Sequence, residues 1–287
     1  MATLQEVTDA RTARVAVRRS RPRRRVMWWQ PVVVAAILVG IWYAAAAYYD
    51  HVRNLAFLVP YPHLVLKAIV APTMPDGSPS TFGSDLWAAL GRTTVVSLTG
   101  LAFAIVIGVV WAMLMAQAKW LENSLYPYAV VLQCVPILAL VPLIGALFGY
   151  EFTSRVIVTV MIALFPMVSN TLFGLQSADR AQRELFRLQR AGLGAELVKL
   201  RIPAALPSIF VGLRTSAGLS VIGAIVGDQF FQRGNPGLGV LIQVTASRLM
   251  GPELYATIII ASLYGVAVFL VFGLLGRLAV GRWHDFG

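Results

Sequence analysis

Charged residues are scarce in this 287-residue chain: only 13% are Asp, Glu, Lys or Arg, whereas soluble domains carry about 25%. Hydrophobic residues make up 58%, and the mean hydropathy is +0.73. A water-soluble domain of this length could not bury so many apolar side chains. The composition therefore excludes a soluble globular enzyme and a disordered or fibrous chain. The remaining class is a membrane protein with several spans.

The groups that carry most enzyme chemistry are also few. Cys134 is the single cysteine, so no disulfide can form within the chain, and the three histidines lack metal-ligand spacing. The sequence contains no P-loop pattern, no H-E-x-x-H motif and no paired carboxylates within its apolar runs. We therefore predict no catalytic residue, no metal site and no cofactor bound by this chain.

Acidic residues are outnumbered by basic ones, 13 against 24, which gives a net charge of +11. Eight arginines precede residue 26, without interleaved aromatics, and an apolar run follows at once: Arg11, Arg14, Arg18, Arg19, Arg21, Arg23, Arg24 and Arg25. This pattern predicts a basic cytoplasmic tail, residues 1–26, under the positive-inside rule. A nucleic-acid-binding arm is one alternative. A cleaved secretory signal is another, although the run is longer than a usual signal core.

Long apolar runs are frequent, and each is long enough for a helix to cross the hydrocarbon core, which takes about 20 residues. None alternates with a period of two, so helices rather than barrel strands are predicted. We predict an all-α fold in which one domain, 27–280, contains six transmembrane helices at about residues 27–49, 93–117, 124–149, 156–176, 207–228 and 254–277.

The loops predict the orientation of this domain. If the N-terminus is cytoplasmic, the inside segments carry 17 of the 24 basic residues. Six of these lie in the segment 177–206: Arg180, Arg183, Arg187, Arg190, Lys199 and Arg201. Such a bias is what the positive-inside rule describes. Both termini are therefore predicted to be cytoplasmic.

A few polar residues lie inside the apolar runs. Gln133, Ser169 and Asn170 accompany prolines that bend helices. They either line a water-filled solute path or lie at kinks that only shape the bundle. Asp228 lies near the outer end of the fifth run, where we expect it to pair with Arg233 or to line the mouth of the path.

The fifth run has two further features. Small residues recur four apart, at Gly212–Ser216 and Gly223–Gly227, a spacing that lets helix backbones approach closely. We predict helix packing there, with a path-lining role as the alternative. Arg214 interrupts the run, and its long side chain is expected to reach the cytoplasmic headgroups.

The cytoplasmic segment 177–206 is predicted to form two short helices. Residues 179–190 are helix-forming and two-faced, with arginines on one side and Leu185 and Leu188 on the other. Glycines then break this helix, residues 195–201 form a second one, and the proline-containing stretch 202–207 ends it. An apolar knob with basic flanks predicts the docking of a soluble partner, and a plain solvated loop is the alternative.

This segment resembles the E-A-A…G…I-x-L-P loop of bacterial ABC importer permeases, which lack an ATPase of their own. Glu184 matches the leading acidic position, Leu185-Phe186 replace the two alanines, and Ile202-Pro203 match the closing pair. Further matches are similar to the nitrate/sulfonate/taurine-type subgroup: the stretch 204–214, Leu164-Phe165-Pro166, Asn170-Thr171 and Gly237-Leu238-Gly239. Arg190 occupies the family's glycine position, so we predict a turn displaced by two residues, to Gly192 and Gly194.

The resemblance implies a permease subunit of the bacterial cytoplasmic membrane. It implies a dimer of permeases, an extracytoplasmic binding protein that delivers a small solute, and a dimeric ATPase subunit that binds the ATP; no nucleic acid is involved. The coupling residues would be Glu184, Leu185, Leu188, Arg190, Gly192, Gly194 and Pro203.

Two other classes remain open at this point. A secondary transporter or channel would show inverted repeats or ionisable residues at mid-membrane. A membrane-anchored assembly protein would have no transport activity. No residue selects among oxyanions, sulfonates and heterocyclic vitamin precursors as the solute.

Overall fold

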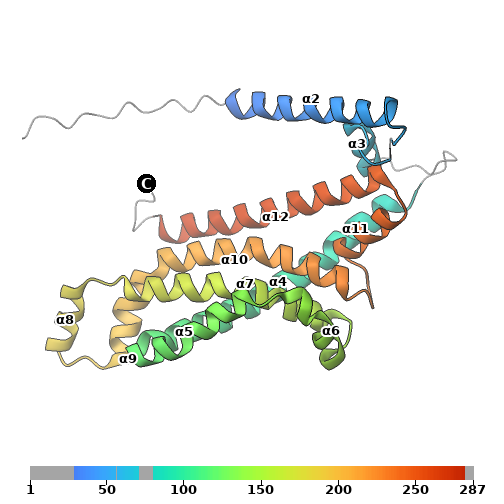
Figure 1. Ribbon diagram of the computed structural model, residues 1–287. Helices are drawn as coiled ribbons and strands as arrows, with labels where there is room; N and C mark the ends of the chain where they lie inside the picture. Colours follow the sequence, from blue (N-terminus) through green and yellow to red (C-terminus); the bar gives the residue numbers. More distant parts are fainter. Residues whose placement is uncertain (1–28, 56, 71–79, 282–287) are drawn as a thin grey trace, which may run out of the picture. The chain divides into compact units, whose positions relative to one another are not determined.

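The computed structural model describes residues 29–55, 57–70 and 80–281, so the basic tail 1–26 lies outside the described residues. Every regular element in these ranges is helical, which confirms the all-α prediction (Figure 1). The chain divides into two units, 1–44 and 45–287, and each is described by itself. Helix α2 (Trp29–His51) contributes most of its length to the first unit and is long and apolar enough to cross a membrane.

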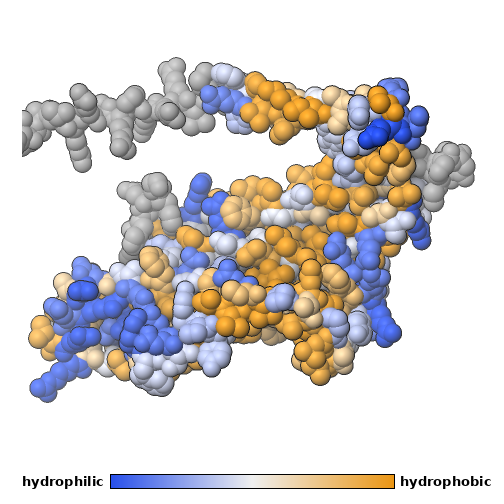
Figure 2. Space-filling model, in the orientation of Figure 1, coloured by the Kyte–Doolittle hydropathy of each residue, from blue (hydrophilic) through white to orange (hydrophobic). Residues whose placement is uncertain are grey.

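The second unit is a helical bundle. Its elements are α3 (Pro62–Val70), α4 (Phe82–Gln117), α5 (Lys119–Cys134), α6 (Ile137–Phe148), α7 (Phe152–Gln176), α8 (Arg180–Leu188), α9 (Leu193–Glu196), the π-helical turn η1 (Leu197–Arg201), α10 (Ile202–Phe230), α11 (Leu238–Ser247) and α12 (Gly251–Val280). Figure 2 shows hydrophobic side chains across the middle of this bundle and hydrophilic ones around α8 and α9. This distribution is typical of a bundle that spans a bilayer.

Helix α7 lies at the centre of the bundle, between α4 and α10. One core cluster joins all three helices and α5 through Met115, Ala129, Val168 and Ala205. On α10, a Cβ at Gly223 would lie 2.8 Å from the Thr159 Cα of α7, and the backbone is equally tight one turn later. Glycine is therefore required where the two helices touch, which confirms the predicted packing role of the small residues.

Two helices extend beyond the apolar runs that predicted them. Helix α4 begins at Phe82 rather than near residue 93, because Phe82, Leu86 and Ala89 recur on one face and are buried against the bundle. The predicted stop at 202–207 is also wrong, since Leu193–Phe230 is one helical stretch. Pro203 lies in the first turn of α10, directly after η1, where its missing N–H leaves little unsatisfied.

The third predicted span is not one continuous helix. Helices α5 and α6 meet at 97° between Cys134 and Ile137. Val135 is extended, as the residue before a proline tends to be, and Pro136 cannot donate the hydrogen bond that would continue α5. Among the described residues, five helices can each cross a membrane, and this bent pair makes the sixth span if it is counted as one.

Candidate functional site

The segment 177–206 folds as a hairpin that leaves the bundle after α7 and returns through α9. Its first helix, α8, begins after Asp179, whose carboxylate accepts a hydrogen bond from the Ala181 N–H at 3.0 Å. This is a standard N-cap that satisfies one free donor of the first turn. A short turn then leads to Gly192, which precedes α9. We call residues 179–201 the hairpin.

The hairpin presents apolar side chains away from the bundle. No residue of α8 is buried. Leu188 is 83% exposed and Leu185 is 52% exposed, and Leu193 of α9 is also exposed. Glu184 lies beside them and is exposed too. These exposed leucines form an apolar surface among the hydrophilic side chains at this end of the bundle.

Arg201 ties the base of the hairpin to α4. Its guanidinium donates to Glu196 Oε1 at 2.8 and 2.6 Å, and its third nitrogen donates to the Ala116 carbonyl at 2.6 Å. Glu196 is buried, so both members of the ion pair are held in place. An ion pair and a hydrogen bond thus join the base of the hairpin to the end of α4.

A second tie joins the hairpin to α7. Arg183 donates to the Gln176 carbonyl at 2.7 Å, and Gln176 in turn donates to Glu122 of α5 at 2.9 Å. Partial burial, together with the positive charge of Arg201, lowers the pKa of Arg183 from its ordinary value, yet the group stays protonated because an arginine starts so high. The hairpin thus makes polar contacts with α4 and α7, and α7 in turn is bonded to α5.

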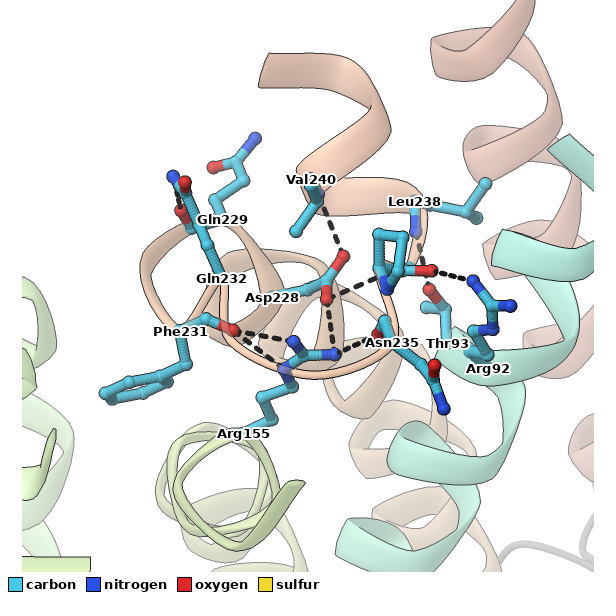
Figure 3. Close-up of polar contacts among 12 residues, drawn as sticks. Arg92, Thr93, Arg155, Asp228, Gln229, Phe231, Gln232, Asn235, Leu238 and Val240 are labelled. Carbon is cyan, nitrogen blue, oxygen red and sulfur yellow. Dashed lines mark hydrogen bonds and ion pairs between the residues drawn. The ribbon is translucent and has the colours of Figure 1, made fainter. Parts of the chain in front are cut away.

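A polar cluster lies at the opposite end of the bundle, where α10 ends (Figure 3). We call it the outer cluster: Arg92, Thr93, Arg155, Asp228 and the backbone of 231–240. Arg155 Nη1 lies 2.8 Å from Asp228 Oδ1, and both side chains are almost fully buried. The same guanidinium donates to the Phe231, Arg233 and Asn235 carbonyls at 2.7 to 2.9 Å.

Asp228 completes this cluster from α10. Its carboxylate accepts the backbone N–H groups of Gly237 at 3.2 Å and Val240 at 2.8 Å, at the start of α11. The expected pairing with Arg233 is therefore wrong, and so is a place for Asp228 at an open mouth of the path. Arg233 instead lies over the Tyr150 ring, at 5.6 Å from its centroid. The bonds of Asp228 and Arg155 join α7 and α10 to the connection between α10 and α11.

Sequence reasoning missed Arg155 because it was counted among loop residues. A signal was available: Asp228 directly follows an apolar run, and a buried carboxylate requires a cation. Arg155 begins the neighbouring run, and the tight contact of α10 with α7 brings the two together, since a Cβ at Gly227 would lie 3.1 Å from the Arg155 Cα.

The three other candidate path residues are separated in this structure. Gln133 is exposed near the α5–α6 bend and makes no side-chain hydrogen bond with the described residues. Ser169 and Asn170 are half-buried on α7, and both donate to the Pro166 carbonyl of their own helix, at 3.4 and 2.8 Å. Their remaining lone pairs are open to further hydrogen bonding, but no described contact joins them to Gln133.

Pro166 lies inside α7, and its missing N–H leaves the Ile162 carbonyl without its regular helical donor. One residue later, the Ala163 carbonyl accepts the hydroxyl of Ser216 from α10 at 2.7 Å. A hydrogen bond between the two helices thus lies next to the proline.

Comparison with known proteins assigns the chain. The family described as binding-protein-dependent transport system inner membrane component matches residues 104–284. The chain belongs to this family. It is the permease subunit of a binding-protein-dependent ABC importer and a multi-pass protein of the inner membrane, as the sequence resemblance implied.

Individual relatives agree with this assignment. The formylaminopyrimidine transport permease ThiX of Halalkalibacterium halodurans is 34% identical over 84% of this permease and 90% of its own length. The putative aliphatic sulfonates transport permease SsuC of Bacillus subtilis is 27% identical over 87% of this permease and 86% of its own length. A solved chain, titled as an amino acid ABC transporter with histidines, is 18% identical with a TM-score of 0.54, covers 70% of this permease and 95% of its own length, and shares the fold.

In this permease the hairpin turn lies at Arg190. Its φ is +51°, in the left-handed region that favours glycine. The Arg190 N–H donates to the Arg187 carbonyl at 2.9 Å, which closes α8. The predicted shift of the turn to Gly192 and Gly194 is wrong: Gly192 has φ −67° and caps α9, and Gly194 lies within α9. The turn therefore lies at the glycine position of the family motif, and in this chain an arginine adopts that left-handed conformation.

Replacement of Arg190 by glycine should therefore stabilise the hairpin. A non-glycine residue in this conformation costs about 1–2 kcal/mol, so Arg190→Gly should slow amide hydrogen exchange in α8 about fivefold. Arg187→Gly is the matched control, because glycine inside a helix costs about 1 kcal/mol and should speed the same exchange. Equal effects of the two substitutions would contradict this account of the turn.

Proposed function

We propose that two copies of this permease enclose the solute path, and that each hairpin docks on one subunit of a partner ATPase. The observation that supports this proposal is the apolar surface of Leu185, Leu188 and Leu193, which faces away from the bundle. Glu184 adds a negative charge at its edge and Arg190 a positive one. Pro203 shapes the base of the hairpin, and Gly192 and Gly194 leave room for the partner beside the leucines.

In this mechanism the hairpin transmits the movement of the ATPase to the transmembrane helices. When ATP closes the partner ATPase, the docked hairpins move with its subunits. Arg201 passes the movement to α4 and Arg183 passes it to α7, while α10 continues directly from η1. Helices so tied move as rigid bodies, and the bundle switches between inward-facing and outward-facing states.

The solute path is lined by Gln133, Ser169 and Asn170. All three are neutral, so they hydrogen-bond a passing solute weakly and release it. Arg155 is bound to Asp228 and to three carbonyls, so it contributes no free charge to this path. The name of the relative ThiX, a formylaminopyrimidine permease, points to a neutral heterocycle as the solute.

Proteoliposomes that contain the permease and its ATPase test the proposal. Uptake of a formylaminopyrimidine should need both ATP and the binding protein, and nitrate or an alkanesulfonate should enter at least about tenfold more slowly. Uptake driven by a proton gradient alone would replace the importer mechanism with secondary transport, and ATP-independent equilibration would indicate a channel. Equal uptake of the anions would overturn the solute class and leave the ATP coupling standing.

A further inference from the structure

A basic cleft lies between α10 and α12, on the half of the bundle that carries the hairpin. Its volume is ≈ 320 Å³, and it is lined by Pro207, Phe210, Val211, Arg214, Gly273, Gly276 and Arg277. The two glycines form a floor without side chains, so the two guanidinium groups and the apolar walls define the space. Arg214 and Arg277 also line an adjoining hollow with Leu270 and Leu274.

Neither arginine has an anionic partner among the described residues. The three ion pairs found there involve other arginines and a lysine. The Arg214 Nε is buried without a hydrogen-bond acceptor, and its Cζ lies 3.9 Å from the centroid of the Phe269 ring. The guanidinium thus packs on an aromatic ring of α12, and the reach of Arg214 to the cytoplasmic headgroups stays a prediction.

The two helices cannot supply the missing anion themselves. Asp228 and Glu253 are the only acidic residues of α10 and α12, and both lie at the other end of these helices. A second copy of the same helices would be equally poor in carboxylates at this depth. An arginine held among apolar side chains is costly unless an anion or water reaches it.

The surroundings of the cleft indicate where the anion comes from. Leu270, Leu274 and Leu278 beside it are more than half exposed, on a helix that is apolar over nearly its whole length. An exposed apolar helix face of this kind contacts the acyl chains of lipids. Basic pockets between transmembrane helices on the cytoplasmic side bind anionic headgroups by this combination of charge and apolar rim.

We propose that this cleft binds the phosphate of an anionic phospholipid from the inner leaflet, with Arg214 and Arg277 as its two ligands. The phosphate oxygens accept from both guanidinium groups, as is favourable for arginine and phosphate. The acyl chains lie along the exposed leucines of α12. The bound lipid neutralises two charges and holds α10 and α12 together near the base of the hairpin.

Native mass spectrometry of the full-length permease with phosphatidylglycerol, and in parallel with phosphatidylcholine, tests this site. Wild type should retain phosphatidylglycerol preferentially, and Arg214→Gln and Arg277→Gln should each weaken its retention about fivefold. Arg248→Gln is the matched control: this arginine is exposed at the end of α11, on the other half of the bundle. Arg214→Lys keeps the charge and should keep most of the lipid, which separates lost binding from lost folding.

Three outcomes would overturn the proposal. One is equal retention of the two lipids by wild type. Another is binding of inorganic phosphate in the absence of lipid, together with displacement of phosphatidylglycerol by phosphate at a concentration that does not affect phosphatidylcholine. This result would identify a site for the free ion. A third is unchanged lipid retention with loss of dimer mass or of the ATPase in Arg277→Gln, which would assign the cleft to a protein carboxylate.

Discussion

Replacement of Arg155 by methionine should lower the free energy of unfolding of the permease by about 3–5 kcal/mol, the usual cost of breaking a buried ion pair by removing one partner. The carboxylate of Asp228 would stay buried with two backbone donors but no cation. Three carbonyls of the α10–α11 connection would lose their donor as well. Reversible unfolding in mixed micelles of increasing sodium dodecyl sulfate measures this loss.

Arg233→Met provides the control for this experiment. Arg233 lies beside the same cluster but is exposed and only stacks over Tyr150, so its loss should cost less than about 1 kcal/mol. The double variant Arg155→Met/Asp228→Leu should recover part of the lost stability, because it leaves no unpaired charge. If Arg155→Met is no less stable than Arg233→Met, the outer cluster does not hold the fold together.

Leu188→Asp should weaken binding of the ATPase about 30-fold or more, the equivalent of one interface hot spot. Leu188 is 83% exposed, so the substitution should leave the bundle folded. Co-purification of the ATPase and ATP-dependent uptake should both fall. Ser247→Asp introduces the same charge at an exposed position of α11, on the other half of the bundle, and serves as the control.

Two further substitutions test the same surface. Glu184→Arg reverses the one negative charge of its edge. Gly192→Glu adds bulk at a position where a Cβ would meet no atom within 4 Å, so the permease itself has room for it. Both should reduce ATPase binding while the protein stays in the membrane. Wild-type association and uptake in all three variants would assign the docking site to another part of the chain.

Hydropathy was sufficient to predict the helices but not their continuity. The bend between α5 and α6 depends on the conformation of one residue before Pro136, whereas Pro166 lies inside an unbroken helix. Both prolines lie in similarly apolar runs. What differs is the packing around each proline, since α7 is enclosed between α4 and α10. Such a contact between distant parts of the chain is not readable from either run alone.

The hairpin and the outer cluster also differed in how far the sequence predicted them. The hairpin was predicted because its pattern is local: a capped helix, a turn and a second helix within one segment. Its turn was misplaced because glycines suggested Gly192, whereas backbone conformation selects Arg190. The outer cluster was missed because Arg155 and Asp228 are far apart in the chain and meet only where two helices pack. Pairings of this kind follow from the tertiary fold.

The 38-residue helical stretch Leu193–Phe230 has a thermodynamic consequence. At 1.5 Å per residue it measures about 57 Å, nearly twice the hydrocarbon thickness of about 30 Å. One end belongs to the hairpin and the other carries Asp228, so one helical stretch is shared by both faces of the membrane. If the two faces bias this element, linkage makes the effect mutual: whatever factor the ATPase imposes on the affinity for the binding protein, the binding protein imposes on the ATPase.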